Sequence, residues 1–241
     1  MLAFIRVIVL LAYFIGLNTL LFIIYLTRPF HRNNVYLGGK FYSTMSKIVG
    51  LKLKMRVSDK VDPNKSYVFI ANHQNSYDLI TICKAAQPGV VTVGKKSLKW
   101  IPIFGLIYWL SANIMIDRKD KNKARDSLSL MEDQMNEKDL SVWFFPEGTR
   151  SNGRGLLPFK TGAFRLALAT KKMIVPVCAS DLHNKIDLNR WDNGTLVIEV
   201  GDPVEIDMQA NAKDLAEHFH ARIKTQFERL NQEAAELSQQ G

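Results

Sequence analysis

The chain has 241 residues, of which 47% are hydrophobic and 23% are charged, and its formal net charge is +9. This apolar content excludes a disordered chain, and the lack of a sequence period excludes a fibrous protein. The two cysteines are too few for a disulfide framework or a metal cluster, and they indicate buried thiols in a reducing compartment.

The positive charge is concentrated at one end of the chain. Residues 1–65 hold ten Lys and Arg but only two acidic residues. The remaining residues hold 22 Lys and Arg and 21 acidic residues, so they are close to neutral. A nucleic-acid-binding protein would more often carry its basic residues as a stripe across the folded domain. Basic residues beside an apolar segment are typical of attraction to anionic head groups, so we expect membrane lipids, and no nucleic acid, as partners.

Residues 7–26 form the first predicted element, an uncharged stretch that reads VIVLLAYFIGLNTLLFIIYL. As a helix it would extend about 30 Å, the thickness of a bilayer core. Its length, and the lack of a small-x-small cleavage site after it, argue against a signal peptide. A buried helix of a water-soluble core is a further alternative, and Asn18 and Thr19 leave a shallow or re-entrant helix open. Because more Lys and Arg follow the segment than precede it, we expect the cytoplasmic membrane, with the main domain on the cytoplasmic side.

Residues 35–50 are a second, weaker helix candidate, with Phe41, Met45 and Ile48 on one side. This helix could return along the membrane surface. We therefore assign residues 1–50 to an N-terminal membrane anchor of one or two helices, and residues 51–241 to a single domain. We expect this domain to fold without residues 1–30.

The rest of the chain alternates between short apolar runs and helical patterns. Residues 51–57 alternate strictly between apolar and basic side chains, which predicts a half-buried edge strand. The other predicted strands are 66–72, 90–94, 113–117, 140–146, 173–180 and 195–201. This alternation predicts an α/β domain with a mixed, largely parallel sheet flanked by helices.

Helical patterns lie between and after these strands. They comprise a helix that begins near Asp78, the segments 101–110 and 161–169, and a helix whose inward face is Ala124, Leu128, Met131 and Met135. The closing helix covers 211–237, with Asn211 as its N-cap. Its apolar stripe is Leu215, Phe219, Ile223, Phe227, Leu230, Ala234 and Leu237.

A histidine and an aspartate, His73 and Asp78, follow the strand at 66–72. Ligands in α/β sheets bind outside the carboxyl ends of strands. If Asp78 opens a helix, its carboxylate can turn back onto one ring nitrogen of His73 and leave the other nitrogen free to accept a proton. The same spacing arises by chance in many proteins, so a surface histidine beside an N-capping aspartate is the alternative.

The segment Phe145-Pro-Glu147-Gly148-Thr149-Arg150 follows another predicted strand. Gly148 allows a sharp turn with exposed N–H groups, and the guanidinium of Arg150 suits a phosphate monoester. Further glycines and the bases Arg154 and Lys160 follow, a composition suited to an anion. Two smaller basic groups, each of which could equally be a solvated turn, follow other strands: Lys95 with Lys96, and Asp117 with Arg118.

The sequence has no nucleophile elbow, no P-loop and no metal-binding motif. A base without a protein nucleophile indicates that the substrate is itself the nucleophile. The base would deprotonate a substrate alcohol, which would attack an activated acyl group directly, without a covalent acyl-enzyme. We expect no metal and no organic cofactor.

These motifs resemble those of the glycerolipid acyltransferase family, and most closely those of bacterial members that acylate lysophosphatidic acid. Four blocks agree in order and spacing: His73-x-x-x-x-Asp78, Asn113-Ile-Met-Ile-Asp117-Arg118, Phe145-Pro-Glu-Gly-Thr-Arg150 and Ile-Val-Pro-Val at 174–177. The third block, with six contiguous matching residues, is far more specific than the His/Asp pair. Met115 stands where many relatives have Phe, a conservative departure. The resemblance runs over about residues 65–205.

The resemblance implies an enzyme that transfers a fatty acyl group from acyl-CoA or acyl carrier protein to the sn-2 hydroxyl of lysophosphatidic acid, giving phosphatidic acid. It implies that His73 is the general base, that Asp78 orients it, and that residues 174–177 shape the acyl or acceptor pocket. The substrate-binding residues that it implies are Lys95, Lys96, Arg118, Glu147, Gly148, Thr149 and Arg150.

Two alternatives remain open. The acceptor could be glycerol-3-phosphate or another lyso-lipid, because the same cations suit several anionic acceptors. The chain could instead be a membrane-tethered binding protein that recruits an acidic partner, although this leaves the His/Asp pair and the third block unexplained.

Overall fold

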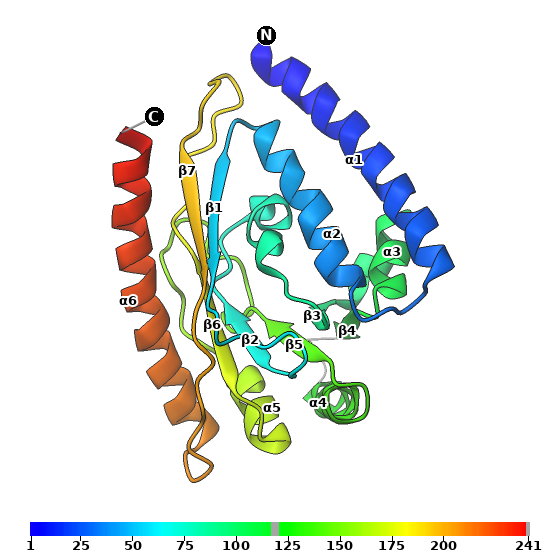
Figure 1. Ribbon diagram of the computed structural model, residues 1–241, viewed down its shortest axis with the longest axis vertical. Coiled ribbons are helices and arrows are strands. Elements are labelled where there is room, and N and C mark those ends of the chain that lie inside the picture. The colour runs from blue at the N-terminus through cyan, green and yellow to red at the C-terminus, as the bar shows by residue number, and fades with distance from the viewer. Residues whose placement is uncertain (117–120, 240–241) are drawn as a thin grey trace.

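A computed structural model describes residues 1–116 and 121–239 (Figure 1). These residues form a seven-stranded sheet with the strand order β1-β7-β6-β2-β5-β3-β4. The strands are β1 (Lys52–Val57), β2 (Val68–Ala71), β3 (Val90–Lys95), β4 (Ile114–Ile116), β5 (Ser141–Phe144), β6 (Ile174–Ala179) and β7 (Thr195–Val200). Among the described strands, β6 and β7 pair antiparallel and all other pairs are parallel. The predicted α/β fold with a mixed, largely parallel sheet is confirmed, and β1 lies at an edge as expected.

Helices cover both faces of this sheet. The α-helices are α1 (Leu2–Thr27), α2 (Asn34–Ser43), α3 (Phe104–Leu110), α4 (Lys121–Glu137), α5 (Gly162–Thr170) and α6 (Ala212–Gln239). Short 3₁₀ helices are η1 (Thr44–Lys47), η2 (Ser76–Ile80), η3 (Ile82–Ala85) and η4 (Lys96–Trp100). One face of the sheet packs against α4, α5 and α6, and the other lies on the side of α1, α2 and α3 (Figure 1).

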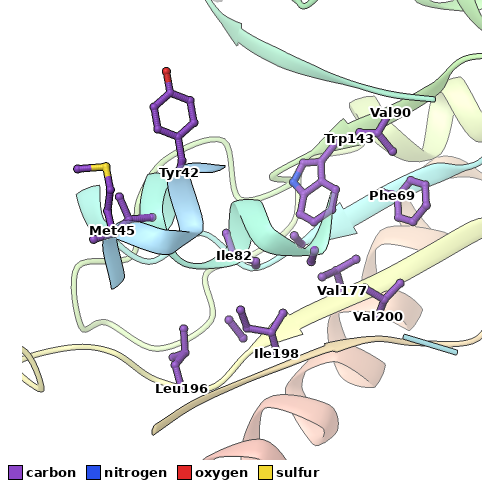
Figure 2. Packing of buried hydrophobic residues seen from close by; sticks show 14 of the residues in the cluster. Tyr42, Met45, Phe69, Ile82, Val90, Trp143, Val177, Leu196, Ile198 and Val200 are labelled. Carbon is purple, nitrogen blue, oxygen red and sulfur yellow. The ribbon is translucent and has the colours of Figure 1, made fainter. Parts of the chain in front are cut away.

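The central strand β2 contributes to the cores on both faces. Its alternate residues Val68 and Ile70 belong to the core under α4–α6, whereas Phe69 and Ala71 belong to the core on the α1–α3 side. Figure 2 shows this second core, with Phe69 close to the neighbouring strands and Tyr42 contributed by α2. Burial on both faces explains why β2 reads as a continuous apolar run.

The closing helix α6 matches its prediction. Asn211 caps it, because its Oδ1 accepts hydrogen bonds from the backbone N–H groups of Lys213 (2.9 Å) and Asp214 (3.0 Å). All seven residues of the predicted stripe pack in the core under the sheet, five of them buried and Phe227 and Leu237 partly buried. The predicted inward face of α4 is also found at Leu128, Met131 and Met135. The side chain of Ala124 lies outside the described residues.

The prediction of a helix that begins near Asp78 was wrong. The structure has two short 3₁₀ helices there, η2 and η3, and Asp78 lies inside η2. Asn75 caps η2 instead, since its Oδ1 accepts a hydrogen bond from the N–H of Tyr77 at 2.8 Å. With the capping role taken by Asn75, the carboxylate of Asp78 is available to the preceding residues.

Helix α1 is the described helix that is long and apolar enough to cross a membrane, by length and composition. It is nevertheless packed against the domain. Leu17, Leu21 and Tyr25 are buried in the core that also contains Phe69. The outer side of the helix leaves large apolar side chains exposed, among them Phe4, Ile8, Leu11, Ile15 and Ile23.

Polar contacts also join α1 to the domain. Arg6 is buried, and its guanidinium donates to the carbonyl oxygens of Leu188 (3.1 Å) and Trp191 (2.9 Å). The amide of Asn18 accepts a hydrogen bond from the Tyr42 hydroxyl at 2.9 Å. The boundary at residue 50 stays a prediction, but these contacts give α1 a share in the domain core. The sequence pattern, read as a separate anchor, did not indicate this.

Candidate active site

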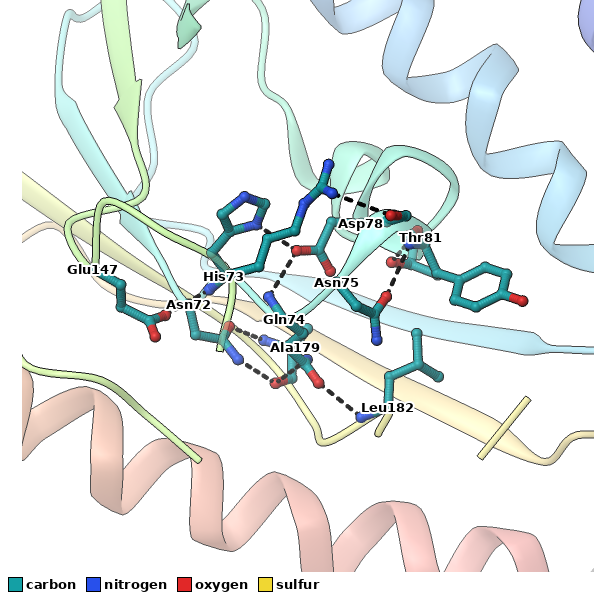
Figure 3. A network of polar contacts seen from close by, with 12 residues as sticks. Asn72, His73, Gln74, Asn75, Asp78, Thr81, Glu147, Ala179 and Leu182 are labelled. Atoms are coloured by element: carbon teal, nitrogen blue, oxygen red, sulfur yellow. Dashed lines mark hydrogen bonds and ion pairs between the residues drawn. The ribbon is translucent and has the colours of Figure 1, made fainter. Parts of the chain in front are cut away.

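The centre of the candidate site is the pair His73 and Asp78, which lies just beyond the carboxyl end of β2 (Figure 3). His73 Nδ1 and Asp78 Oδ2 are 2.6 Å apart, and the same oxygen accepts a hydrogen bond from the N–H of Gln74 at 2.7 Å. Asp78 is buried, whereas the His73 side chain is 20% exposed. Within the described residues, Nε2 has no hydrogen-bond partner. With its proton on Nδ1, the imidazole therefore presents an open Nε2 lone pair.

The backbone of His73 is held by Glu147, from the turn that follows β5. The N–H of His73 donates to Glu147 Oε1 at 2.7 Å, and the N–H of Leu157 donates to Oε2 at 3.0 Å. Glu147 is only 3% exposed. Burial raises the pKa of its carboxyl above the ordinary value, and the two N–H groups act in the opposite direction. Both of its oxygens thus accept hydrogen bonds from the backbone, and one of these bonds holds the His73 main chain in place.

Two buried amides, Asn72 and Gln74, brace the His73 segment from behind (Figure 3). The Asn72 side chain exchanges two hydrogen bonds with the backbone of Ala179, both at 2.9 Å. Gln74 accepts a hydrogen bond from the N–H of Leu182 at 2.7 Å. These contacts fix the His73 segment to the end of β6. Our sequence analysis gave neither amide a role, although a polar residue directly after an all-apolar buried strand is a signal that could have identified Asn72.

The loop after β5 packs directly on His73. The ring of Phe145 stacks on the imidazole, with ring centroids 4.1 Å apart and an interplanar angle of 18°. The N–H groups of Ser151 and Asn152 donate to the carbonyl oxygens of His73 and Gln74, both at 2.9 Å. The segment directly after the third sequence block is therefore joined to the first block by backbone hydrogen bonds. Phe145 is a further site residue to which the sequence analysis gave no role.

Gly148 is favoured by its left-handed backbone conformation, and the side chain of Lys160 lies against it. Its φ is +69°, and a Cβ there would lie 2.6 Å from Nζ of Lys160. The lysine side chain therefore crosses directly over the turn. Thr149 and Arg150 follow as exposed residues, and Arg150 Nη1 donates to Ser76 Oγ at 3.1 Å. Because Ser76 lies in η2 with Asp78, this contact places the guanidinium beside the His73–Asp78 pair.

Two further predicted cations, Lys95 and Lys96, lie along the same edge of the sheet. Lys95 ends β3 and Lys96 begins η4, and both are exposed. Strand β3 pairs with β5, which pairs with β2, all in parallel, so their carboxyl ends lie on one edge. Neither lysine forms an ion pair within the described part of the chain. Asp117 and Arg118 follow β4 and lie outside the described residues.

Residues 174–177 lie in β6 and are buried. They pair residue by residue with β2, from Val68↔Ile174 to Ala71↔Val177. The structure thus places the fourth sequence block in the core, beside the strand that leads to His73.

The two cysteines differ from His73 in their surroundings. Both are free thiols, and burial raises the pKa of each well above its ordinary value. Among the described residues, no group of three or more His, Cys, Asp or Glu side chains could hold a metal ion.

Comparison with known proteins identifies the family of the chain. Residues 52–180 match the acyltransferase family. The chain is 43% identical to a 1-acyl-sn-glycerol-3-phosphate acyltransferase of Haemophilus influenzae, over 84% of this chain and 85% of that protein. It is 40% identical to the protein of the same name from Escherichia coli K12, over 88% of each chain.

A solved structure also resembles most of the chain. The crystal structure of the 1-acyl-sn-glycerophosphate acyltransferase from Thermotoga maritima matches with a TM-score of 0.73 and 20% identity, over 95% of this chain and 97% of that one. At this identity the likeness concerns the fold.

Proposed function

Since the chain belongs to the acyltransferase family, we propose that it transfers a fatty acyl group from an acyl thioester to the sn-2 hydroxyl of lysophosphatidic acid. The product is phosphatidic acid, a precursor in phospholipid biosynthesis. The names of relatives that are 40–43% identical over most of the chain support this acceptor. The observation that carries the proposal is the 2.6 Å contact between His73 Nδ1 and Asp78, which leaves Nε2 open beside an exposed arginine.

In the proposed reaction, His73 Nε2 takes the proton from the acceptor hydroxyl as its oxygen attacks the thioester carbonyl carbon. Asp78 holds Nδ1–H and stabilises the imidazolium that forms. The carbon–sulfur bond then breaks, and the proton on Nε2 passes to the leaving thiolate. No protein nucleophile takes part, which agrees with the raised pKa values of the two thiols, Cys178 in the core and Cys83 partly buried.

The acceptor phosphate is bound, in this proposal, by the cations on the rim of the site. Arg150 offers a planar pair of donors and Lys160 a second charge close to the turn at Gly148. Thr149 adds an exposed hydroxyl, and Lys95, Lys96 and Arg118 supply further positive charge. Glu147 acts indirectly in this proposal: it holds the backbone of His73 in place and does not contact the phosphate.

The acceptor is a membrane lipid, and α1 provides the means of reaching it. We propose that α1 lies along the surface of the cytoplasmic membrane with its exposed apolar side chains in the lipid, and that the domain lies on the cytoplasmic side. Burial of Arg6 near one end and Tyr25 near the other supports an orientation along the surface, because a spanning helix would have to release one of them.

The proposal can be tested with the purified full chain and a panel of acceptors. Lysophosphatidic acid, glycerol-3-phosphate and lysophosphatidylcholine are each supplied with acyl-CoA or acyl carrier protein as donor, and products are measured by mass spectrometry. We expect phosphatidic acid from lysophosphatidic acid, and its loss in His73→Ala. Faster acylation of another acceptor would overturn the acceptor assignment, and full activity of the variant would overturn the role of the base.

A further inference from the structure

A hollow of about 690 Å³ lies beside the edge strand β1, and none of the residues assigned to the active site lines it. Its walls come from α2, η1, β1, η3 and the loop before β7. Four lysines from four different elements surround it: Lys40, Lys47, Lys52 and Lys84. We refer to it as the lysine hollow.

Positive charge in the lysine hollow is only partly balanced. One carboxylate, Asp192, lines it and pairs with Lys52 at 2.9 Å. Lys47 and Lys84 form no ion pair within the described residues. Lysines drawn together in this way repel each other, and a bound anion would relieve the repulsion. The charge therefore favours an anionic ligand.

The inner wall of the lysine hollow is apolar. Leu51, just before β1, and Leu53 and Met55, within β1, line it on the side that packs against the core. Trp191, which is 78% exposed, lines another side. An inorganic anion would use only the lysines. A ligand with a phosphate at one end and a hydrocarbon chain at the other would contact both the lysines and this apolar wall.

The lysine hollow also lies where α1 meets the domain. The Tyr13 hydroxyl of α1 is 2.8 Å from the hydroxyl of Thr44, and Arg6 donates to the carbonyl of Trp191 at 2.9 Å. Thr44 and Trp191 both line the hollow. Figure 1 shows the start of β1 and the loop before β7 near the N-terminal end of α1.

We propose that the lysine hollow binds the head group of an anionic membrane phospholipid, at a site separate from the acceptor site. The phosphate lies among the lysines, and the glycerol and first chain carbons lie against Leu53, Met55 and Trp191. This inference rests on the proposed attachment of α1 along the membrane surface, which places the hollow at head-group depth. Such a site would hold the enzyme more firmly on membranes rich in anionic lipid, including its own product.

The test uses the full chain in micelles of an uncharged detergent that contain either phosphatidylglycerol or phosphatidylcholine. Native mass spectrometry measures the lipid that each variant retains. Lys47→Gln with Lys84→Gln removes two charges from the hollow, and Lys138→Gln with Lys224→Gln removes two exposed charges from the opposite face of the sheet. We expect the first pair to weaken retention of phosphatidylglycerol by at least about tenfold, and the second pair to leave it unchanged. Equal losses in both pairs, or no loss in the first, would overturn the proposal.

Two further arms identify the source of the anion. Inorganic phosphate should compete weakly, and Trp191→Ala should reduce retention of phosphatidylglycerol. If inorganic phosphate binds as tightly as the lipid, with the same dependence on the lysines, the site takes a free anion and the proposal fails. If the hollow variants retain lipid but lose acyl transfer selectively from acyl carrier protein, the lysines dock an acidic protein and the proposal also fails.

An activity control separates this inference from the proposed function. Both lysine pairs should keep acyl transfer from acyl-CoA to a short-chain, water-soluble acceptor, since neither pair belongs to the active site. A wild-type chain that acylates no lyso-lipid would overturn the proposed function, while the lipid-retention measurement would still decide on the lysine hollow.

Discussion

His73 and the cations around it are held by very different numbers of contacts. The His73 segment is fixed by Asp78, by Glu147 and by two buried amides, and Phe145 covers its ring. Arg150, by contrast, is exposed, and within the described part of the chain its side chain makes one hydrogen bond, to Ser76. A base must meet one proton in one geometry, whereas a cation on the rim can adjust to a phosphate that arrives with a mobile lipid. This difference predicts that substitutions in the His73 segment lower kcat, and that substitutions of the exposed cations raise the KM for the acceptor.

The largest effect is expected from His73→Ala. Loss of the base should lower kcat by about 10²–10⁴, with little change in acceptor binding, because the cations on the rim remain. Steady-state kinetics with lysophosphatidic acid and acyl-CoA measure both quantities. Turnover above about a tenth of wild type would contradict the assignment of His73 as the base.

A smaller effect is expected from Glu147→Gln. The variant can still accept one of the two backbone hydrogen bonds, but its NH₂ group meets the other N–H donor. We expect the free energy of unfolding to fall by about 1–3 kcal/mol, and kcat to fall while the acceptor KM changes little. The matched control is Glu228→Gln, an exposed carboxylate on α6. A selective rise in acceptor KM would instead show that Glu147 contacts substrate.

Arg150→Lys tests the exposed cations around His73. The charge is kept, but an ammonium cannot present two parallel donors to a phosphate. We expect the KM for lysophosphatidic acid to rise by about tenfold and the KM for the acyl donor to change less. A rise confined to the KM for the acyl donor would show that Arg150 binds the thioester and not the acceptor phosphate.

The smallest effect is expected from Cys83→Ala combined with Cys178→Ala. Burial keeps both thiols protonated, so neither should carry an acyl group. The double variant should retain catalysis, and mass spectrometry of the wild-type chain incubated with acyl-CoA should find no acyl-cysteine. A trapped thioester on either sulfur would contradict direct transfer.

Local periodicity was enough to predict most of the fold. Alternation predicted β1, and the apolar stripe with its Asn211 cap predicted α6, because both patterns reflect contacts between a continuous segment and one neighbouring face. The short helix η2 was predicted less well, since Asn75, not Asp78, caps it. Two asparagines or aspartates within one turn leave the cap ambiguous when only the sequence is read.

The contacts that sequence reasoning missed join distant parts of the chain. Glu147 lies 74 residues from His73, and nothing in its own segment shows that its carboxylate will accept a backbone N–H there. Helix α1 reads as a membrane segment by composition, yet Arg6 contacts a loop 182 to 185 residues away. Deleting residues 1–30 would therefore uncover part of the core on the α1–α3 side, which the sequence-based division at residue 50 did not anticipate.

The most direct test of the account is a double-mutant cycle on His73 and Asp78. If Asp78 acts only by orienting and stabilising the imidazole, it has no function once His73 is absent. The variant Asp78→Asn should be severely impaired by itself, and His73→Ala with Asp78→Asn should be no slower than His73→Ala alone. Losses in kcat that multiply in the double variant would show that the two side chains act independently, and would contradict the assignment of the pair as a single oriented base.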